Sequence, residues 1–268
     1  MTNHNRILLV VGDKFANYVQ GKDAITVSQL RGLLSLSIPL LGGQGVTVLV
    51  PGQGLGDECV KQLLQEAAAS VNLSSFDFSL WHSLPERAPR SLSHKHNSAN
   101  TLISCPRQVA ADVFETHLLI DEDCELMQDH LTGQHVQGMI LIEATRQALL
   151  AVAEAYLLPK NNIDYAFVLN TLSVNYSHYT FPVAAILRCV MTDMQVDNPR
   201  RLSFSAEVHV EQCGQVVSTL NVDYGAMEKQ RITKREAMLA TKIQSDYLTY
   251  VAANRQVWEE PLAQVENL

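Results

Sequence analysis

The run from Met139 to Leu158 constrains the fold most, because its composition predicts a helix that is apolar on nearly every side. It has no Gly or Pro before Pro159 and is rich in Leu, Ala, Ile and Met. Since such a helix has no polar face to give to water, other structure must wrap around it. Glu143, Arg146, Gln147 and Glu154 are the exceptions, and the i, i+3, i+4 spacing of the first three puts them on one face. The fold must therefore supply partners for a polar stripe on a buried helix.

The segments on both sides of this helix follow a strand pattern, since they are rich in Val, Leu, Thr, Tyr and Phe with partial alternation. Two precede the helix and four follow it: Thr101–Ser104, Asp112–Asp121, Tyr165–Tyr179, Ala184–Val196, Leu202–Val210 and Gln215–Tyr224. One long helix within a set of antiparallel strands predicts a curved sheet wrapped round the helix. We therefore predict an α+β protein with a hotdog domain over residues 99–227.

The preceding residues alternate strands with helices, which predicts a small α/β domain over residues 1–82. The expected elements are strands at Arg6–Val11 and Val46–Val50, helices at Val27–Ile38 and Leu55–Ala69, and the stretch Phe76–Trp81. Gly52, Gly54 and Gly56 suggest a nucleotide loop, but Asp57 stands where the dinucleotide fingerprint needs its third glycine. We therefore favour a docking or scaffolding role. Residues 83–98 are predicted as a linker and residues 228–268 as a C-terminal helical tail.

Several separated motifs resemble one family in their order along the chain. They are His94-Lys95, Asn100–Ser104, the loop Asp129–Gly138 and the helical segment Glu143–Gln147. Together they resemble the hotdog domain of the A-factor biosynthesis proteins, which make γ-butyrolactone signals, and the resemblance covers residues 94 to about 227. More distantly, the loop and helix resemble the β-hydroxyacyl carrier protein dehydratases. The loop departs from that dehydratase pattern, because it is one residue shorter and has Gln137 in place of a proline.

The resemblance implies an acyl-thioester enzyme that uses an acyl carrier protein or CoA thioester and no cofactor. In the A-factor family, the proposed reaction joins a β-ketoacyl chain to the hydroxyl of dihydroxyacetone phosphate. We therefore expect an acyltransferase of signal or secondary-metabolite biosynthesis with a small-molecule acceptor. A single hotdog domain completes its site by pairing, so we expect a homodimer. The alternatives are a dehydratase or thioesterase of the same fold, and a non-catalytic acyl-binding or scaffold protein.

The polar stripe and the loop supply the candidate catalytic residues Glu143, His130 and Arg146. Desolvation of Glu143 would raise its pKa and make it a base, with His130 or His135 as the alternative, while Arg146 would bind the phosphate of the acceptor. The candidate substrate-binding residues are Gly133, His135, Gly138 and Gln147. Backbone N–H groups at the helix start near Gly138 would polarise the thioester carbonyl.

Each candidate also has a structural alternative. Glu143 and Arg146, at i and i+3, could simply neutralise each other, and His130 could brace the loop. For His135 the structural role is favoured, and Gly133 could serve only a backbone turn. The pair His94-Lys95 could be a solvated charged stretch.

Composition limits the partners of the protein. A net charge of -8 and a pI of about 5.6 argue against binding to nucleic acid or to an anionic membrane. An acidic carrier protein would need a local basic patch, for which Lys95, Arg107, Arg200 and Arg201 are candidates. The start of the sequence lacks the pattern of a signal peptide, so we expect the cytoplasm. The five cysteines are scattered without CxxC spacing, which predicts reduced thiols and no metal site.

Overall fold

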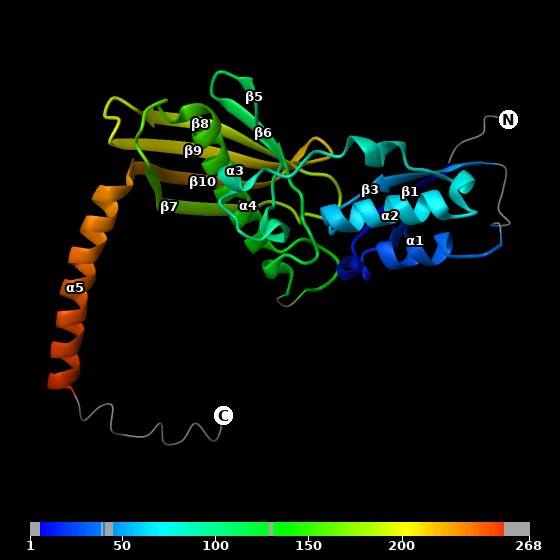
Figure 1. The fold of residues 1–268 in the computed structure, drawn as a ribbon, viewed down its shortest axis with the longest axis horizontal. Helices are drawn as coiled ribbons and strands as arrows, with labels where there is room; N and C mark the ends of the chain where they lie inside the picture. The colour runs from blue at the N-terminus through cyan, green and yellow to red at the C-terminus, as the bar shows by residue number, and fades with distance from the viewer. Residues whose placement is uncertain (1–5, 39, 41–44, 129–130, 255–268) are drawn as a thin grey trace.

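The computed structural model describes residues 6–38, 40, 45–128 and 131–254, which form two β-sheets arranged along the long axis of the molecule (Figure 1). The first sheet is parallel, with the strand order β2-β1-β3-β4, and the second has six antiparallel strands in the order β5-β6-β8-β9-β10-β7. The strands of the second sheet are β5 (Arg107–Ala110), β6 (Val113–His117), β7 (Tyr165–Tyr176), β8 (Ile186–Gln195), β9 (Arg201–Gln212) and β10 (Gln215–Glu228).

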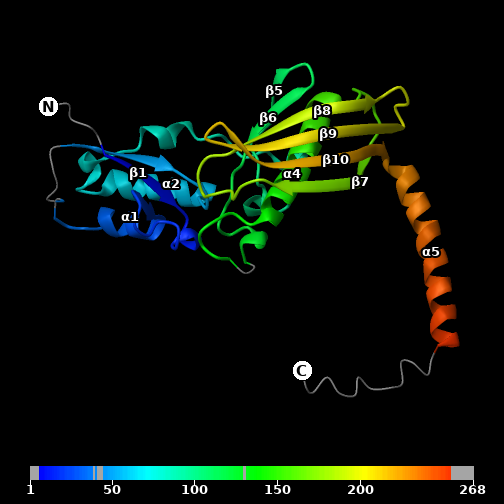
Figure 2. The ribbon, with the colours of Figure 1, turned by 180° about the vertical axis from the view of Figure 1, so that it is seen from behind.

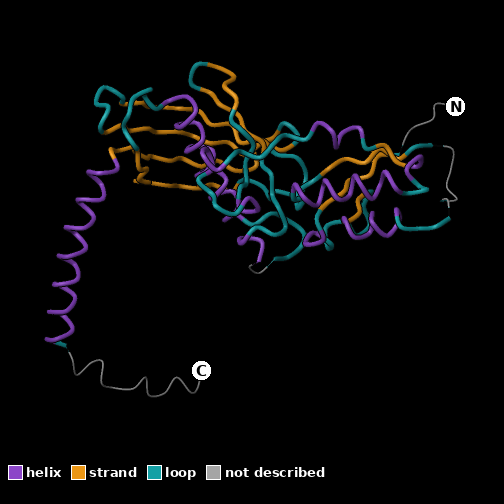
Figure 3. The backbone as a smooth tube through the Cα atoms, in the orientation of Figure 1, coloured by secondary structure: helices purple, strands orange, loops and turns teal. Residues whose placement is uncertain are grey.

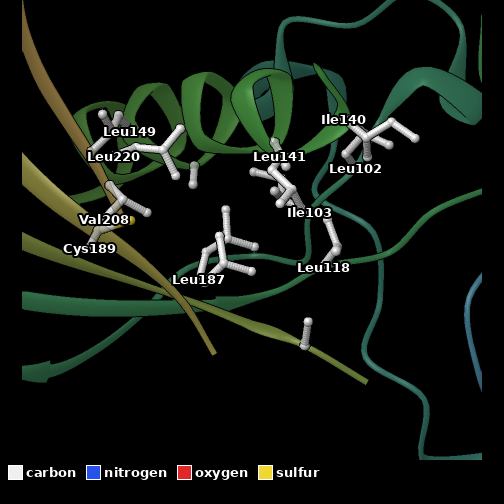
Figure 4. Packing of buried hydrophobic residues seen from close by; sticks show 14 of the residues in the cluster. Leu102, Ile103, Leu118, Ile140, Leu141, Leu149, Leu187, Cys189, Val208 and Leu220 are labelled. Atoms are coloured by element: carbon white, nitrogen blue, oxygen red, sulfur yellow. The ribbon is translucent and has the colours of Figure 1, made fainter. Parts of the chain in front are cut away.

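Helix α4 (Gly138–Val152) lies against one face of the second sheet, which is the hotdog arrangement (Figure 2). Side chains of β9 alternate between buried and partly exposed positions along the strand, so one face of this sheet is turned to the helix. In the core, Leu141 and Leu149 of α4 lie above Leu187, Val208 and Leu220 of the strands (Figure 4). Burial of each such side chain contributes about 2 kcal/mol, so the contact between helix and sheet stabilises this part of the chain strongly.

The predicted helix is confirmed, with one change at its end. After Val152 the chain continues as a π-helical turn, η6 (Ala153–Leu157), before Pro159. The four strands after the helix are also confirmed, with ends shifted by a few residues. Upstream, the predicted strand Asp112–Asp121 is the shorter β6, and β5 was not predicted because its side chains are all exposed.

The predicted strand Thr101–Ser104 is wrong. This segment makes only isolated bridges, between Ile103 and Leu118 and between Arg87 and Ser104. The reason is that the backbone N–H of Leu102 donates to the side chain of Gln147 on α4 instead of to a neighbouring strand. The polar stripe of the helix therefore replaces part of a strand ladder.

The N-terminal unit, defined here as the described residues up to Ser83, contains the parallel sheet and the helices that cover it (Figure 3). Its elements are β1 (Ile7–Val11), η1 (Asp13–Phe15), β2 (Ala24–Thr26), α1 (Val27–Leu34), β3 (Thr47–Pro51), α2 (Asp57–Ala69), η2 (Leu73–Ser75), β4 (Phe76–Asp77) and η3 (Ser79–Ser83). Its core contains Leu30, Leu49 and Leu63, separate from the core of the hotdog part. The alternation of strands and helices is confirmed, and β2 is an additional short strand.

The carboxyl end of the parallel sheet, where open α/β sheets bind ligands, is covered by the hotdog part. Gln53 is buried there, and its side chain donates to the carbonyl of Leu118 and accepts from the N–H of Ile120. The N–H of Gly54 donates to the carbonyl of Ile120 at 3.0 Å. A Cβ on Gly52 would lie 2.5 Å from the carbonyl oxygen of Pro182. The glycines after β3 therefore allow the two units to approach closely.

Residues 83–98, predicted as a linker, also pack on both units. The guanidinium of Arg87 is 7% exposed, bonds to Asp57 at 2.9 Å and donates to the carbonyls of Thr101 and Leu119. Helix α3 (Arg90–Ser93) follows, and then η4 (Ser98–Asn100) and, further along, η5 (Glu125–Gln128). The boundaries proposed from the sequence, at residues 82, 98 and 227, stay a prediction.

A single long helix, α5 (Lys229–Ala253), follows β10 and projects away from the sheet (Figures 1 and 2). It includes the charged stretch, because Lys, Arg and Glu favour helices, and none of its described side chains is buried. Tyr247 and Tyr250 are exposed and Trp258 lies outside the described residues. No helix among residues 6–254, as far as they are described, is long and apolar enough to cross a membrane.

Candidate functional site

The polar stripe of α4 meets a cation from another segment. Glu143 accepts from Arg146 through Nε at 2.8 Å and through Nη2 at 2.7 Å, and Lys95 Nζ lies 2.6 Å from Glu143 Oε1. These three side chains are only 20 to 39% exposed. Two cations around one carboxylate leave the Lys95–Glu143–Arg146 cluster with a net positive charge.

Gln147 anchors this cluster to the segment that precedes β5. It is fully buried, its carbonyl accepts from the N–H of Leu102 at 2.9 Å, and its amide donates to the carbonyl of Asn100 at 2.9 Å and to Glu143 at 3.0 Å. All hydrogen-bonding groups of the side chain are therefore used inside the protein. Gln147 positions Glu143 and has no group left for a substrate.

The expectation that the pKa of Glu143 is raised is wrong. Desolvation alone would raise it, but hydrogen bonds from Arg146, Lys95 and Gln147 outweigh that effect and lower the pKa from its ordinary value of 4.5 to about 2. The same pairing raises the pKa of Arg146 above its ordinary value. Glu143 is therefore ionised at neutral pH and holds two cations in place, instead of exchanging protons.

His94 and Lys95 are not a solvated stretch, because both side chains contact α4 or the turn that extends it. They follow α3, and while Lys95 binds Glu143, His94 Nε2 lies 3.2 Å from Oε1 of Glu154 in the π-helical turn. The His94 ring also packs edge-on against Phe167 of β7, with 5.9 Å between centroids. The resemblance to the A-factor family was the one sequence signal that pointed to this pair, while Glu154 stood out in the sequence only as a charged residue in an apolar helix.

An apolar groove of about 550 Å³ lies between α4 and β7. Its walls include Ile142, Leu149 and Leu150 of the helix and Phe167, Leu169 and Leu172 of the strand. Arg146, His94 and Glu154 line the same groove, so the charged groups lie at the wall of a cavity that suits an alkyl chain. Thr145, another lining residue, is 1% exposed, and its hydroxyl has no hydrogen-bond partner among the described residues.

The remaining predicted residues lie at the other end of α4. His135 Nδ1 is 3.2 Å from the hydroxyl of Thr132, and its ring packs on Tyr179 with 4.8 Å between centroids. Gly133 has a φ of +70° and its carbonyl accepts from the N–H of Tyr18 in the N-terminal unit, so a turn and a docking contact account for it. Neither residue lines the groove. His130 lies outside the described residues.

Gly138 begins α4 and lies close to the side chain of Tyr176. A Cβ there would lie 2.6 Å from the hydroxyl oxygen of Tyr176, at the end of β7. The Tyr176 side chain, which is half exposed, therefore covers the first turn of the helix. No sequence pattern pointed to Tyr176, because the contact joins two elements that are far apart in the chain.

Three of the residues proposed from the sequence as a basic patch each pair with a different acidic residue. Lys95 belongs to the cluster, Arg107 pairs with Glu115 at 3.0 Å, and Arg200 lies 3.8 Å from Glu228. Among the residues that the structure describes, no group of His, Cys, Asp or Glu side chains could hold a metal ion. The charged and titratable side chains that line the groove are those of His94, Arg146, Glu154, Asp164, Tyr165, Tyr224 and Lys229.

Comparison with known proteins places this geometry in context. The family described as AfsA, the A-factor biosynthesis hotdog domain, matches residues 77–227. The dehydratase heterocomplex ApeI:P from Xenorhabdus doucetiae has 17% identity, a TM-score of 0.42, and covers 56% of this chain and 97% of its own. A thioesterase from Haemophilus influenzae has 9% identity, a TM-score of 0.35, and covers 47% and 78%. A mutant thioesterase from Pseudomonas aeruginosa has 9% identity, a TM-score of 0.36, and covers 47% and 81%. A search among curated proteins finds no significant match.

Proposed function

Because the chain belongs to the A-factor biosynthesis hotdog family, we propose that it transfers a β-ketoacyl group from an acyl carrier protein to the hydroxyl of an acceptor like dihydroxyacetone phosphate. The product would serve the synthesis of a signal or secondary metabolite. The proposal needs no cofactor, since the thioester itself is the activated acyl donor. The cytoplasm remains the predicted compartment.

The observation that carries the proposal is the net positive cluster at the wall of an apolar groove. The groove has room for an acyl chain, and Arg146 lines it. Arg146 uses Nε and Nη2 for Glu143, while Nη1 has no partner among the described residues. A guanidinium fixed in this way suits a phosphate, so Arg146 would bind the acceptor.

The reaction itself forms one ester and releases one thiol. The acceptor oxygen attacks the thioester carbonyl carbon and loses its proton to a base, and the negative charge moves to the carbonyl oxygen. Positive charge at the groove wall, supplied by Arg146, would stabilise this oxyanion. Collapse of the intermediate breaks the C–S bond, and the thiolate takes up a proton to leave as the carrier thiol.

Transfer is favoured over dehydration by the state of Glu143. A hotdog dehydratase resembling this chain would need a helix carboxylate that gives and takes protons. With a pKa of about 2 and three donors, Glu143 carries no proton near neutral pH. Hydrolysis and silent acyl binding are the outcomes that the experiment below must separate from transfer.

We further propose that two copies pair through β7. This strand is at the edge of the sheet, where β10 is its ladder partner within the described chain, and Leu169 and Leu172 on it are exposed. An open edge with apolar side chains is a site for pairing with another strand. Sedimentation equilibrium of the full chain should give a dimer mass, which Leu169→Lys should shift toward the monomer while Glu236→Lys on α5 should not.

The test of the function is incubation with β-ketoacyl and, separately, 3-hydroxyacyl carrier protein thioesters, with and without dihydroxyacetone phosphate, followed by mass spectrometry of carrier and acceptor. Acyl loss from the carrier together with a matching mass gain on the acceptor supports transfer. Equal acyl loss without acceptor would point to hydrolysis, and loss of one water from a 3-hydroxyacyl chain to dehydration. An unchanged carrier in every mixture would refute all three activities.

A further inference from the structure

We propose that His94 and Glu154 form the proton-transfer pair of this site, with His94 Nδ1 as the general base for the attacking hydroxyl. The inference rests on the proposed acyl-thioester function and deepens it. Neither residue was among the candidates that the sequence predicts.

The contacts of His94 set up one nitrogen for catalysis. Its Nε2 is held 3.2 Å from Glu154 Oε1, and the ring is held edge-on by Phe167. Within the described chain, Nδ1 has no hydrogen-bond partner. The two side chains are 38% and 28% exposed, and both residues line the apolar groove. The pair is therefore accessible to a substrate without being free in bulk water.

The backbone at His94 explains how two neighbouring residues reach two separate carboxylates. His94 ends α3 in the left-handed region, with a φ of +57°, and its N–H donates to the carbonyl of Arg90 at 3.0 Å. This conformation costs a non-glycine residue about 1 kcal/mol, so the surrounding contacts must maintain it. Lys95 then binds Glu143 and His94 binds Glu154, about three turns along the same face.

The turn that carries Glu154 is itself unusual. Ala153–Leu157 is a π-helical turn, a feature that occurs often at functional sites. It follows directly on α4, so Glu154 keeps the direction of Glu143 and Arg146, and faces His94. The His94 ring is therefore contacted by Glu154 from the π-helical turn and by Phe167 from β7. The backbone of His94 itself is strained.

The chemistry follows from the contact at Nε2. A carboxylate at Nε2 favours the tautomer with its proton on Nε2, which leaves the lone pair of Nδ1 free to accept a proton. The acceptor O–H gives its proton to Nδ1 while its oxygen bonds to the thioester carbon. Glu154 stabilises the imidazolium that forms, and when the C–S bond breaks the imidazolium returns the proton to the thiolate. Atoms and charge balance, and the histidine is regenerated.

The other titratable and charged groups that line the groove either form ion pairs or have no basic nitrogen. The titratable and charged ones are Arg146 of α4, Asp164 and Tyr165 at the start of β7, Tyr224 of β10 and Lys229 of α5. Lys229 pairs with Asp164 at 3.1 Å and Arg146 pairs with Glu143. Burial raises the pKa of Tyr224 above the range in which it could act as a base. His94 is thus the one imidazole among the described residues that line this groove.

The decisive variant is His94→Gly, because glycine adopts a φ of +57° without strain and leaves a space for free imidazole. In the transfer assay we expect kcat to fall about 10² to 10³-fold with KM changed by less than about 3-fold, and added imidazole to restore at least about tenfold of the loss. Glu154→Gln should lower kcat about tenfold and change the pH–rate profile. Exposed His178→Gln is the matched control and should keep full activity.

A purely structural His94 would give a different result. His94→Gly that keeps wild-type kcat, or loses activity that imidazole does not restore while circular dichroism and thermal melting stay unchanged, would overturn the proposal. A misfolded His94→Gly is replaced by His94→Asn, since asparagine also tolerates the left-handed region, with the same outcomes for kcat and pH profile.

A second readout needs no turnover. An octyl bromomethyl ketone, whose tail enters the groove, should alkylate His94 Nδ1, forming a C–N bond and releasing bromide, and the matching fatty acid should protect it. Peptide mass spectrometry of the full chain identifies the modified residue. Labelling of His94 without turnover of any thioester would support the pair and refute the proposed function. Transfer activity with no labelling of His94 and an active His94→Gly would refute the pair and leave the function standing.

Discussion

Replacement of Glu143 with glutamine tests the charge cluster most directly. The lowered pKa of Glu143, about 2 against an ordinary 4.5, corresponds to about 3 kcal/mol of stability near pH 7. This is an upper value, because Arg146 is 39% exposed and water screens part of the pair. Glutamine keeps the shape and removes the charge, so the free energy of unfolding should fall by up to about 3 kcal/mol.

The stability difference between wild type and Glu143→Gln should depend on pH in one direction. A carboxyl whose pKa is lowered by folding stabilises the protein above its ordinary pKa, and this contribution is lost as the pH falls toward the folded value. The difference between wild type and Glu143→Gln should therefore be constant from neutral pH to about pH 5 and shrink to under about half near pH 3. Other carboxyl groups titrate in both proteins alike, so the difference isolates Glu143.

Urea unfolding followed by circular dichroism at several pH values measures this difference. Glu236→Gln, on exposed α5, is the control and should change the free energy of unfolding by less than about 0.5 kcal/mol. A Glu143→Gln protein as stable as wild type at pH 7, or a difference that does not shrink in acid, would refute the assignment of Glu143 as an ionised anchor.

The remaining predictions concern neighbouring contacts. Arg146→Lys should lower transfer at least about tenfold, because lysine loses the second donor and the forked geometry, and an unchanged rate would remove Arg146 from acceptor binding. Gln147→Leu should cost about 2 kcal/mol, since the buried N–H of Leu102 loses its acceptor, and differential scanning calorimetry that shows no fall in Tm would contradict this. Gly52→Ala should cost about 1 to 3 kcal/mol, because the new Cβ meets the carbonyl oxygen of Pro182; equal stability in urea would show that the two units separate easily.

The helix and most strands could be predicted because they depend on local patterns. The apolar run after Met139 has the composition and length of a helix, and the strands after it alternate over enough residues to be recognised. The strand prediction for Thr101–Ser104 failed because the backbone N–H of Leu102 donates to the side chain of Gln147 on α4. No local pattern encodes such a contact. The π-helical turn was missed for a similar reason, since its residues Ala153–Leu157 also favour an ordinary helix.

The sequence by itself determined that a buried helix would carry Glu143, Arg146 and Gln147 on one face, because that depends only on 3.6 residues per turn. Only the tertiary structure decided what these groups do. Desolvation and hydrogen bonding act on the pKa of Glu143 in opposite directions, and the balance depends on Lys95, which comes from a segment 48 positions earlier in the chain. The segment that brings Lys95 to Glu143 also places His94 beside Glu154, at the wall of the groove. Long-range contacts set the energies here, so residue spacing reveals which groups share a face but not which of them exchanges protons.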